Sequence, residues 1–284
     1  MVVFSPPHNM GDYRSIQVPC GQCIGCRLDY SKMWAMRCYH ESRLHKHNCF
    51  ITLTYDDEHV PWSSVTGEQT LVKRDLQLFW KSLRKKFPDD KIRYFACGEY
   101  GDTTFRPHYH AIIFGIDFAD KLLYKRSGLG FNYYISPLLA ETWKAGNSTC
   151  CDVSFDTCAY VARYVVKKLS GELGKEKYEG IEKEFCVMSR RPGIGKDWIC
   201  NNFADVYPYD EVVTFDNGRK RILKPARYYD SLYDIDHHAE LEVIKAKRLD
   251  RASRCFEENA VAGRMDQREE FKKLQTQFLK RSVE

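Results

Sequence analysis

The sharpest feature of the sequence is the stretch RPHYHAIIFG, residues 106–115. Successive side chains of a β-strand point to opposite faces, so His108 and His110 share one face and can bind the same ion. Tyr109 and Ala111 point the other way. The stretch therefore predicts a strand with apolar side chains on one face and a histidine pair on the other.

A second predicted strand, residues 92–99, precedes this one and is joined to it by the short polar segment YGDTTFR. A connection of this length favours antiparallel pairing, which would bring Glu99 beside both imidazoles. Two histidines and a carboxylate form a usable divalent site with open positions for phosphate oxygens, suited to Mg2+ or Mn2+ and compatible with Zn2+. The alternative is that both histidines only form hydrogen bonds in the sheet and Glu99 is a surface carboxylate.

Periodicity elsewhere predicts the remaining elements. Strands are expected at residues 50–55 (FITLTY), 152–155 and 185–188, helices at 72–87, 135–144 and near Asp197, a hairpin at Asn217-Gly218, and one or two long charged helices over 236–284. The predicted fold class is α+β, with a central antiparallel sheet of about five strands flanked by helices. Its expected segments are a Cys-rich N-terminal segment (1–48), a core (49–200) and a mainly helical C-terminal extension (201–284).

A helix is also expected after Asp156, which is a suitable N-cap. One face of this helix carries the polar residues Tyr160, Tyr164, Lys167 and Lys168. A metal ion or ammonium group beside a phenol favours the phenolate, which is the nucleophilic form. The alternative is an ordinary amphipathic helix whose tyrosines pack while its lysines extend to solvent.

Cysteines cluster near the start of the chain in the segment CGQCIGC, residues 20–26. Cysteines separated by two intervening residues in this way are typical ligands of a small structural zinc site. The expected ligands are Cys20, Cys23, Cys26 and Cys38, with His40 and Cys49 as alternatives to Cys38. Reduced cysteines in a tight turn are the other interpretation, since the chain is long enough to bury a core without crosslinks.

The chain has 284 residues, a net charge of +5 and 14% aromatic residues, a balance that leans toward a polyanionic partner. It has no leader pattern at its start and no apolar window approaching roughly 18 residues, so an intracellular, soluble protein without membrane contact is expected. The basic residues expected to follow a nucleic acid backbone are Arg74, Lys81, Lys85, Arg163, Arg190 and Arg191. Each of them is otherwise ordinary solvated surface.

Three motifs occur in order along the chain: FITLTY, then GEYG followed by RPHYH, then YVARYVVKK. Together they resemble the HUH endonucleases, which are named for their histidine, hydrophobic, histidine motif. The paired tyrosines resemble the two-tyrosine rolling-circle replication initiators. The segments PCGQCIGCR and SRRPGIGKDW resemble those of gokushovirus-type microphage initiators, and the resemblance covers residues 18–200.

The resemblance implies a metal-dependent nuclease core that nicks and rejoins single-stranded DNA at a phage origin through a 5′-phosphotyrosyl intermediate. Its implied partners are origin DNA and host helicase and polymerase in the cytoplasm of a bacterial host, with no small-molecule cofactor. The implied site residues are the ligands His108, His110 and Glu99 for Mg2+ or Mn2+, the nucleophiles Tyr160 and Tyr164, and the assisting lysines Lys167 and Lys168. Two other functions stay open: an HUH transposase or plasmid relaxase, and a non-enzymatic, zinc-stabilised protein that binds single-stranded nucleic acid.

Overall fold

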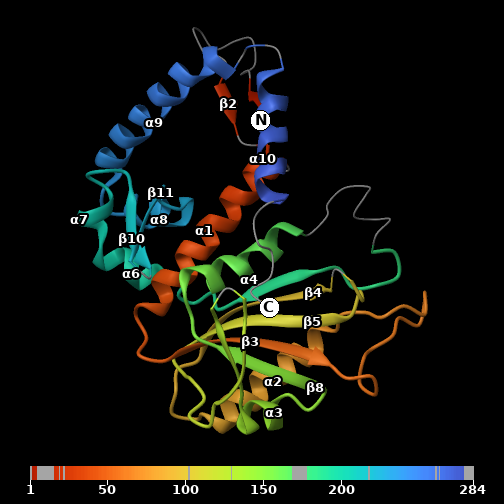
Figure 1. Cartoon of the computed structure of the whole chain (residues 1–284). Helices are drawn as coiled ribbons and strands as arrows, with labels where there is room; N and C mark the ends of the chain where they lie inside the picture. The colour runs from red at the N-terminus through yellow and green to blue at the C-terminus, as the bar shows by residue number, and fades with distance from the viewer. Residues whose placement is uncertain are drawn as a thin grey trace. The chain divides into compact units, whose positions relative to one another are not determined.

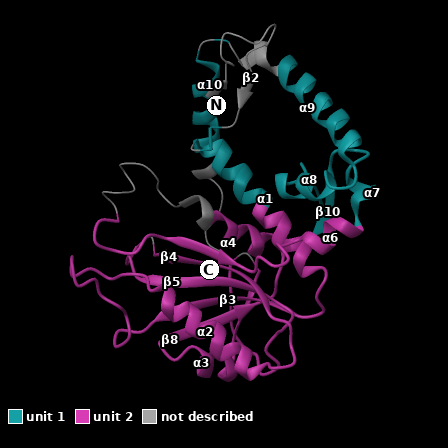
Figure 2. Ribbon diagram, turned by 180° about the vertical axis from the view of Figure 1, so that it is seen from behind, with its two compact units in different colours: residues 1–33, 202–282 teal, residues 34–201, 283–284 magenta. Residues whose placement is uncertain are grey.

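The computed structural model describes residues 2–4, 16–18, 20–21, 23–101, 103–128, 130–167, 178–216, 218–259, 261 and 263–277, with 2–4, 16–18, 164–167, 255–259 and 276–277 described in their backbone alone. The chain divides into two compact units, coloured separately in Figure 2. Unit 1 comprises residues 1–33 and 202–282, and unit 2 comprises residues 34–201 and 283–284. The first division falls inside helix α1 (Ile24–Ser42) and not at residue 48. Within the described ranges, no helix is both long and apolar enough to cross a membrane.

Unit 2 is built on a seven-stranded antiparallel sheet with the order β6-β7-β8-β3-β5-β4-β9. Figure 1 labels its central strands β8, β3, β5 and β4. The predicted α+β class, an antiparallel sheet flanked by helices, is confirmed. The strands of the sheet are β3 (Asn48–Tyr55), β4 (Arg93–Tyr100), β5 (Pro107–Phe114), β6 (Leu122–Arg126), β7 (Asn132–Ile135), β8 (Gly146–Cys151) and β9 (Phe185–Met188).

One face of the sheet forms the main core with helices α2 (Lys73–Lys86) and α3 (Pro137–Thr142). Tyr109, Ala111 and Ile113 of β5 point to this face, and α2 adds its own buried stripe, which includes Leu76 and Phe79. The predicted alternation along β5 is therefore confirmed. Because apolar residues recur every three or four positions in α2, its opposite face carries lysines and arginines to solvent.

The other face of the sheet carries the histidines and packs against α4 (Phe155–Lys167) and the C-terminal half of α1. The ring of Trp34 on α1 lies 5.1 Å from that of Phe95 on β4. Tyr39 on the same helix lies 5.8 Å from Phe155 at the start of α4. Helices thus cover both faces of the sheet.

Unit 1 contains a two-stranded ribbon, a hairpin and several helices. Arg248 donates hydrogen bonds to the carboxylates of Asp210 and Asp230, and the rings of Tyr207 and Tyr233 stack 3.7 Å apart. The described elements are β1 (Val2–Phe4), β2 (Ile16–Val18), α7 (Phe203–Val206), β10 (Val212–Asp216), β11 (Arg219–Leu223), α8 (Arg227–Tyr233), α9 (His238–Asn259) and α10 (Arg264–Gln277). The predicted hairpin and long charged helices are confirmed, while Asn217 lies outside the described residues.

Three sequence expectations within unit 2 need correction. Strand β8 ends at Cys151, so the strand expected at 152–155 lies too far along the chain. Helix α4 begins at Phe155, and its cap is Ser154, whose hydroxyl accepts from the Thr157 amide while the Thr157 hydroxyl accepts from the Ser154 amide. The hairpin of β6 and β7 raises the sheet from the expected five strands to seven.

Candidate functional site

The predicted metal group is assembled by the register of the β4–β5 hairpin. Glu99 lies directly opposite His108 in the antiparallel pair, and His110 follows two residues later on the same face. The Oε1 atom of Glu99 lies 2.6 Å from Nε2 of His108 and 3.1 Å from Nε2 of His110. Three ligand atoms of these side chains lie within 4.8 Å of one another. The structure therefore brings together the three ligands expected from the sequence.

The opposite nitrogen of each imidazole is held by a hydrogen bond. Nδ1 of His108 lies 3.0 Å from the carbonyl oxygen of Arg106, which can only accept, so Nδ1 carries the proton. Nδ1 of His110 lies 2.9 Å from the hydroxyl of Thr52 on β3. Partners of this kind fix the ring orientation of metal-binding histidines. Both rings are thus held with Nε2 directed toward Glu99.

A positive charge is needed between Glu99 and the histidine rings. If Nδ1 of His108 is protonated, its Nε2 can lie 2.6 Å from a carboxylate oxygen only when a second proton or a cation sits between them. Burial alone would raise the pKa of Glu99, but hydrogen bonds from His108 and His110 outweigh it and lower the pKa to about 2. The carboxylate is therefore ionised at neutral pH.

The spacing of the donor atoms fits a divalent ion. In six-coordinate geometry with bonds of about 2.1 Å, neighbouring ligand atoms lie about 3.0 Å apart. The hydrogen-bonded separations between Oε1 of Glu99 and the two Nε2 atoms, 2.6 and 3.1 Å, lie on either side of this value, so the shorter contact would lengthen by about 0.4 Å around an ion. His110 and Glu99 are buried, whereas His108 is partly exposed, so the group is open on the side of His108.

Tyr160 lies beside this group on helix α4. Its ring meets that of His110 edge-on at 5.1 Å and that of Phe50 at 5.9 Å. The side chain is buried, as are Cys158 and Val161 on the same helix. Tyr164 and Lys167 belong to α4, but their side chains lie outside the described residues, as does the whole of Lys168.

The basic residues of α2 are separated from the histidine group by the sheet. Arg74, Lys81 and Lys85 are exposed on α2, which packs against the opposite sheet face. Arg163, in contrast, belongs to α4 and follows Tyr160 by three residues. Of these residues, only Arg163 lies on an element that covers the histidine face.

Arg190 and Arg191 are exposed in the turn that follows β9. The neighbouring Ser189 donates its amide proton to the carbonyl of Tyr94, near the end of β4 remote from Glu99. Five residues of strand, about 17 Å, separate Tyr94 from Glu99. These arginines therefore lie at the other end of the sheet from Glu99, His108 and His110.

The cysteines expected to bind zinc are divided. Cys20, Cys23 and Cys26 converge in unit 1. Cys38 does not join them, because it follows Cys26 by twelve residues in the same helix, which corresponds to about 18 Å. It is fully buried in unit 2, as are the two alternatives, His40 against Trp198 and Cys49 on β3.

Sequence reasoning missed two residues that hold this part of the fold. Thr52 lies opposite His110 in the β3–β5 pair, which only the strand register reveals. Glu41 on α1 forms a buried ion pair with Arg93 on β4 and accepts the Gly195 amide at 2.7 Å. The signal for Glu41 was a carboxylate on the apolar side of a helix, but its partner is far away in sequence.

Comparison with known proteins gives consistent matches. The family model for the replication-associated protein ORF2 family matches residues 48–169, which include Glu99, both histidines and both tyrosines. Replication-associated protein ORF2 of Spiroplasma virus 4 is 34% identical over 255 residues, covering 87% of this chain and 78% of the relative.

Two further relatives come from bacteriophages. Replication-associated protein VP4 of Bdellovibrio phage phiMH2K is 34% identical over 244 residues, covering 83% of this chain and 73% of the relative. Replication-associated protein ORF4 of Chlamydia phage 1 is 33% identical over 162 residues, covering 54% of this chain and 39% of the relative. No solved structure matches the chain.

Proposed function

The chain belongs to the replication-associated protein ORF2 family of gokushovirus-type rolling-circle initiators, and from this membership we propose that it nicks and rejoins single-stranded DNA at a phage origin. The reaction would start and end rolling-circle replication in the cytoplasm of a bacterial host. Its enzymatic class is a metal-dependent endonuclease and strand transferase with tyrosine nucleophiles.

The observation that carries this proposal is the convergence of Glu99, His108 and His110 beside Tyr160. Arg106 and Thr52 hold the two imidazoles in orientations that direct them toward Glu99. The ionised carboxylate of Glu99 is buried, and burying a charge costs free energy that an ordinary sheet face has no reason to spend. The ring of Tyr160, the proposed nucleophile, is centred 5.1 Å from that of His110, which supports a catalytic role for Glu99, His108 and His110.

The three ligands would hold Mg2+ or Mn2+. When bound, the ion would polarise the scissile phosphodiester and stabilise the charge that develops on its oxygens. Glu99 supplies the anionic ligand and the two histidines supply neutral ones. The ring orientation set by Arg106 and Thr52 keeps both Nε2 atoms available.

The tyrosines would perform the transfer. The phenolic oxygen of one tyrosine loses its proton and attacks phosphorus, the bond from phosphorus to the 3′ oxygen breaks, and this oxygen leaves as a 3′ hydroxyl. The protein is then joined to the 5′ phosphate. A 3′ hydroxyl that attacks this phosphotyrosyl bond restores the DNA without external energy, since one ester replaces another.

Two nucleophiles would serve the two ends of replication. One of Tyr160 and Tyr164 would cleave the origin, and the 3′ hydroxyl would prime a host polymerase behind a host helicase. The other would cleave the regenerated origin while the first adduct is resealed into a circle. Lys167 or Lys168 would stabilise the phenolate or the phosphate.

The proposal is tested by incubating the protein with labelled single-stranded DNA of random sequence and Mn2+ or Mg2+, and running a denaturing gel. We expect label that migrates with the protein when the ion is present, and no such label when a chelator is included from the start of the incubation. His110→Ala and the double variant Tyr160→Phe, Tyr164→Phe should abolish it, whereas His47→Ala, an exposed histidine outside the group, should not. Tight binding without any adduct would instead place the protein among non-enzymatic DNA-binding proteins.

A further inference from the structure

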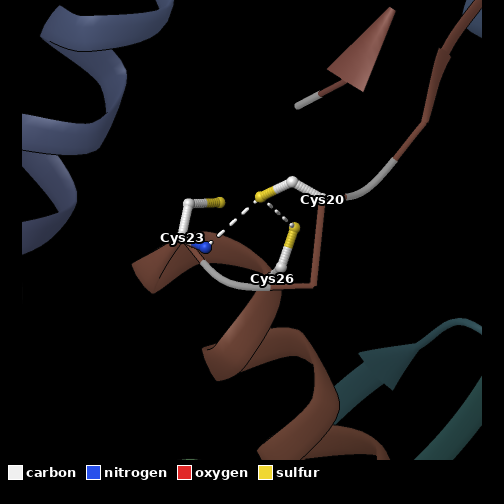
Figure 3. Close-up of side chains that lie close together, drawn as sticks. All are labelled: Cys20, Cys23 and Cys26. Atoms are coloured by element: carbon white, nitrogen blue, oxygen red, sulfur yellow. Dashed lines mark hydrogen bonds between the residues drawn. The ribbon is translucent and has the colours of Figure 1, made fainter. Parts of the chain in front are cut away.

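Three cysteine sulfurs converge at the start of helix α1 (Figure 3). Cys20 follows strand β2, Cys23 immediately precedes the helix, and Cys26 lies in its first turn. The three sulfurs lie within 4.8 Å of one another, and those of Cys20 and Cys26 are 3.9 Å apart. None of the three forms a disulfide, and all are only partly buried, whereas Cys38 and Cys49 are buried in the core. An ion can therefore reach them from solvent.

The spacing of the sulfurs identifies the kind of centre that fits. Four thiolate-type ligands around one ion with bonds of about 2.3 Å place neighbouring sulfurs about 3.8 Å apart. The separation between Cys20 and Cys26, 3.9 Å, is close to this value. A disulfide needs a sulfur–sulfur distance of about 2.05 Å, which is far shorter. The geometry thus fits a single soft ion.

The local backbone is shaped to hold negative charge on the sulfurs. The amide of Cys23 donates to Sγ of Cys20 at 3.3 Å. Gly21 has a φ of +75°, which lets the chain turn back so that Cys20 faces the helix. The first turn of this 19-residue helix contains no acidic residue, so the positive end of the helix dipole faces the sulfurs without a competing carboxylate in that turn.

We propose that Cys20, Cys23 and Cys26 bind one structural Zn2+ that fastens β2 to the start of α1. Among the described residues no fourth histidine, cysteine or carboxylate joins these three, so the group supplies three of the ligands of the ion. Strand β2 is three residues long and pairs only with the equally short β1 in the described sheet, and such a ribbon is marginal by itself. The ion would anchor this ribbon, against which α9 lies.

The proposal does not depend on the nuclease function, because the cysteines belong to unit 1 and the Glu99 group to unit 2. The test titrates reduced, full-length protein without a histidine tag with Co2+ and records thiolate-to-cobalt charge transfer in the near-ultraviolet. We expect one equivalent of this signal, and zinc should displace it. Cys23→Ser should lose it, whereas Cys200→Ser, at an exposed cysteine elsewhere, and His110→Ala should keep it. An unchanged signal in Cys23→Ser would overturn the proposal.

A second measurement on the wild-type protein does not depend on the folding of any variant. Alkylation is followed residue by residue by mass spectrometry, with and without Zn2+. We expect zinc to protect Cys20, Cys23 and Cys26 while Cys200 reacts equally in both samples. Equal labelling of the three cysteines with and without zinc would refute the site. A disulfide between Cys20 and Cys26 in the freshly isolated protein would refute it as well.

Discussion

Replacement of Glu41 by glutamine removes the charge from a buried ionic contact in unit 2. Glu41 is 3% exposed and its partner Arg93 is 6% exposed. Burial raises the pKa of Glu41, but hydrogen bonds from His45, Gly195 and Arg93 outweigh it, so the pKa lies below its usual range and the carboxylate is ionised. Arg93 also donates to the carbonyl of Pro192 at 2.9 Å. The contact therefore ties α1 and β4 to the segment 192–195.

The size of the effect follows from what the variant leaves behind. Glu41→Gln keeps the shape of the side chain but leaves the Arg93 guanidinium buried without a counter-charge, which costs about 3–5 kcal/mol. A double variant, Glu41→Leu with Arg93→Met, removes both charges. It leaves the buried Gly195 amide without its acceptor, at a cost of about 1–3 kcal/mol, while the part-buried Pro192 carbonyl and the His45 ring lose partners that water replaces more readily. The double variant should therefore be more stable than the single one.

The assay is urea denaturation followed by tryptophan fluorescence. All five tryptophans lie between residues 34 and 198, so the signal reports on unit 2 alone. Glu141→Gln is the control, because it breaks the exposed contact with Lys86 and should shift the midpoint far less. A loss below about 1 kcal/mol for Glu41→Gln, or a double variant less stable than the single one, would refute this reasoning.

Three further predictions address other parts of unit 2. Burial lowers the pKa of His40 to about 3, so below about pH 6.5 the unfolded chain takes up a proton at this residue while the folded chain does not. The free energy of unfolding of the wild type should therefore fall by about 2 kcal/mol between pH 7 and 5 relative to that of His40→Gln. Parallel curves for the two proteins in pH-dependent denaturation would contradict this. Gly146 has a φ of +148° and no room for a Cβ, which would lie 2.4 Å from the Asp56 amide nitrogen and the Thr54 carbonyl oxygen. Gly146→Ala should therefore lower the free energy of unfolding in urea by about 3 kcal/mol. Gly128→Ala, where a Cβ meets open space, should change it little. Thr52→Val removes the partner of His110 and should weaken Mn2+ binding roughly 10–100-fold in calorimetry, with Thr52→Ser near the wild type; equal affinities would exclude a positioning role.

The sequence predicted the centre of the sheet well because its signals there are local. The alternation in residues 106–115 assigned both faces of β5, and the short connection from residue 99 predicted the hairpin that brings Glu99 to His108. Strand β9 was predicted at its observed bounds. Each of these features depends on neighbours within about a dozen residues.

Features that depend on distant pairing were not predictable in the same way. Strand β8 reads GNSTCC, which has little apolar alternation, and it is a strand because β3 offers a free edge to its backbone. Strand β6 is exposed along its whole length and therefore lacks a buried face to mark it. The partnership of Thr52 with His110 joins residues 58 positions apart and follows only from the register of β3 on β5.

The proposed reaction requires that tyrosines of α4 become joined to DNA. The most direct measurement is mass spectrometry of the covalent adduct after digestion of both protein and DNA, to identify the residue that carries the nucleotide. We expect a nucleotide joined through its 5′ phosphate to Tyr160 or Tyr164, formed only with a divalent ion and found on the remaining tyrosine in each single Tyr→Phe variant. A nucleotide on any other residue, or an adduct that forms without metal, would contradict it.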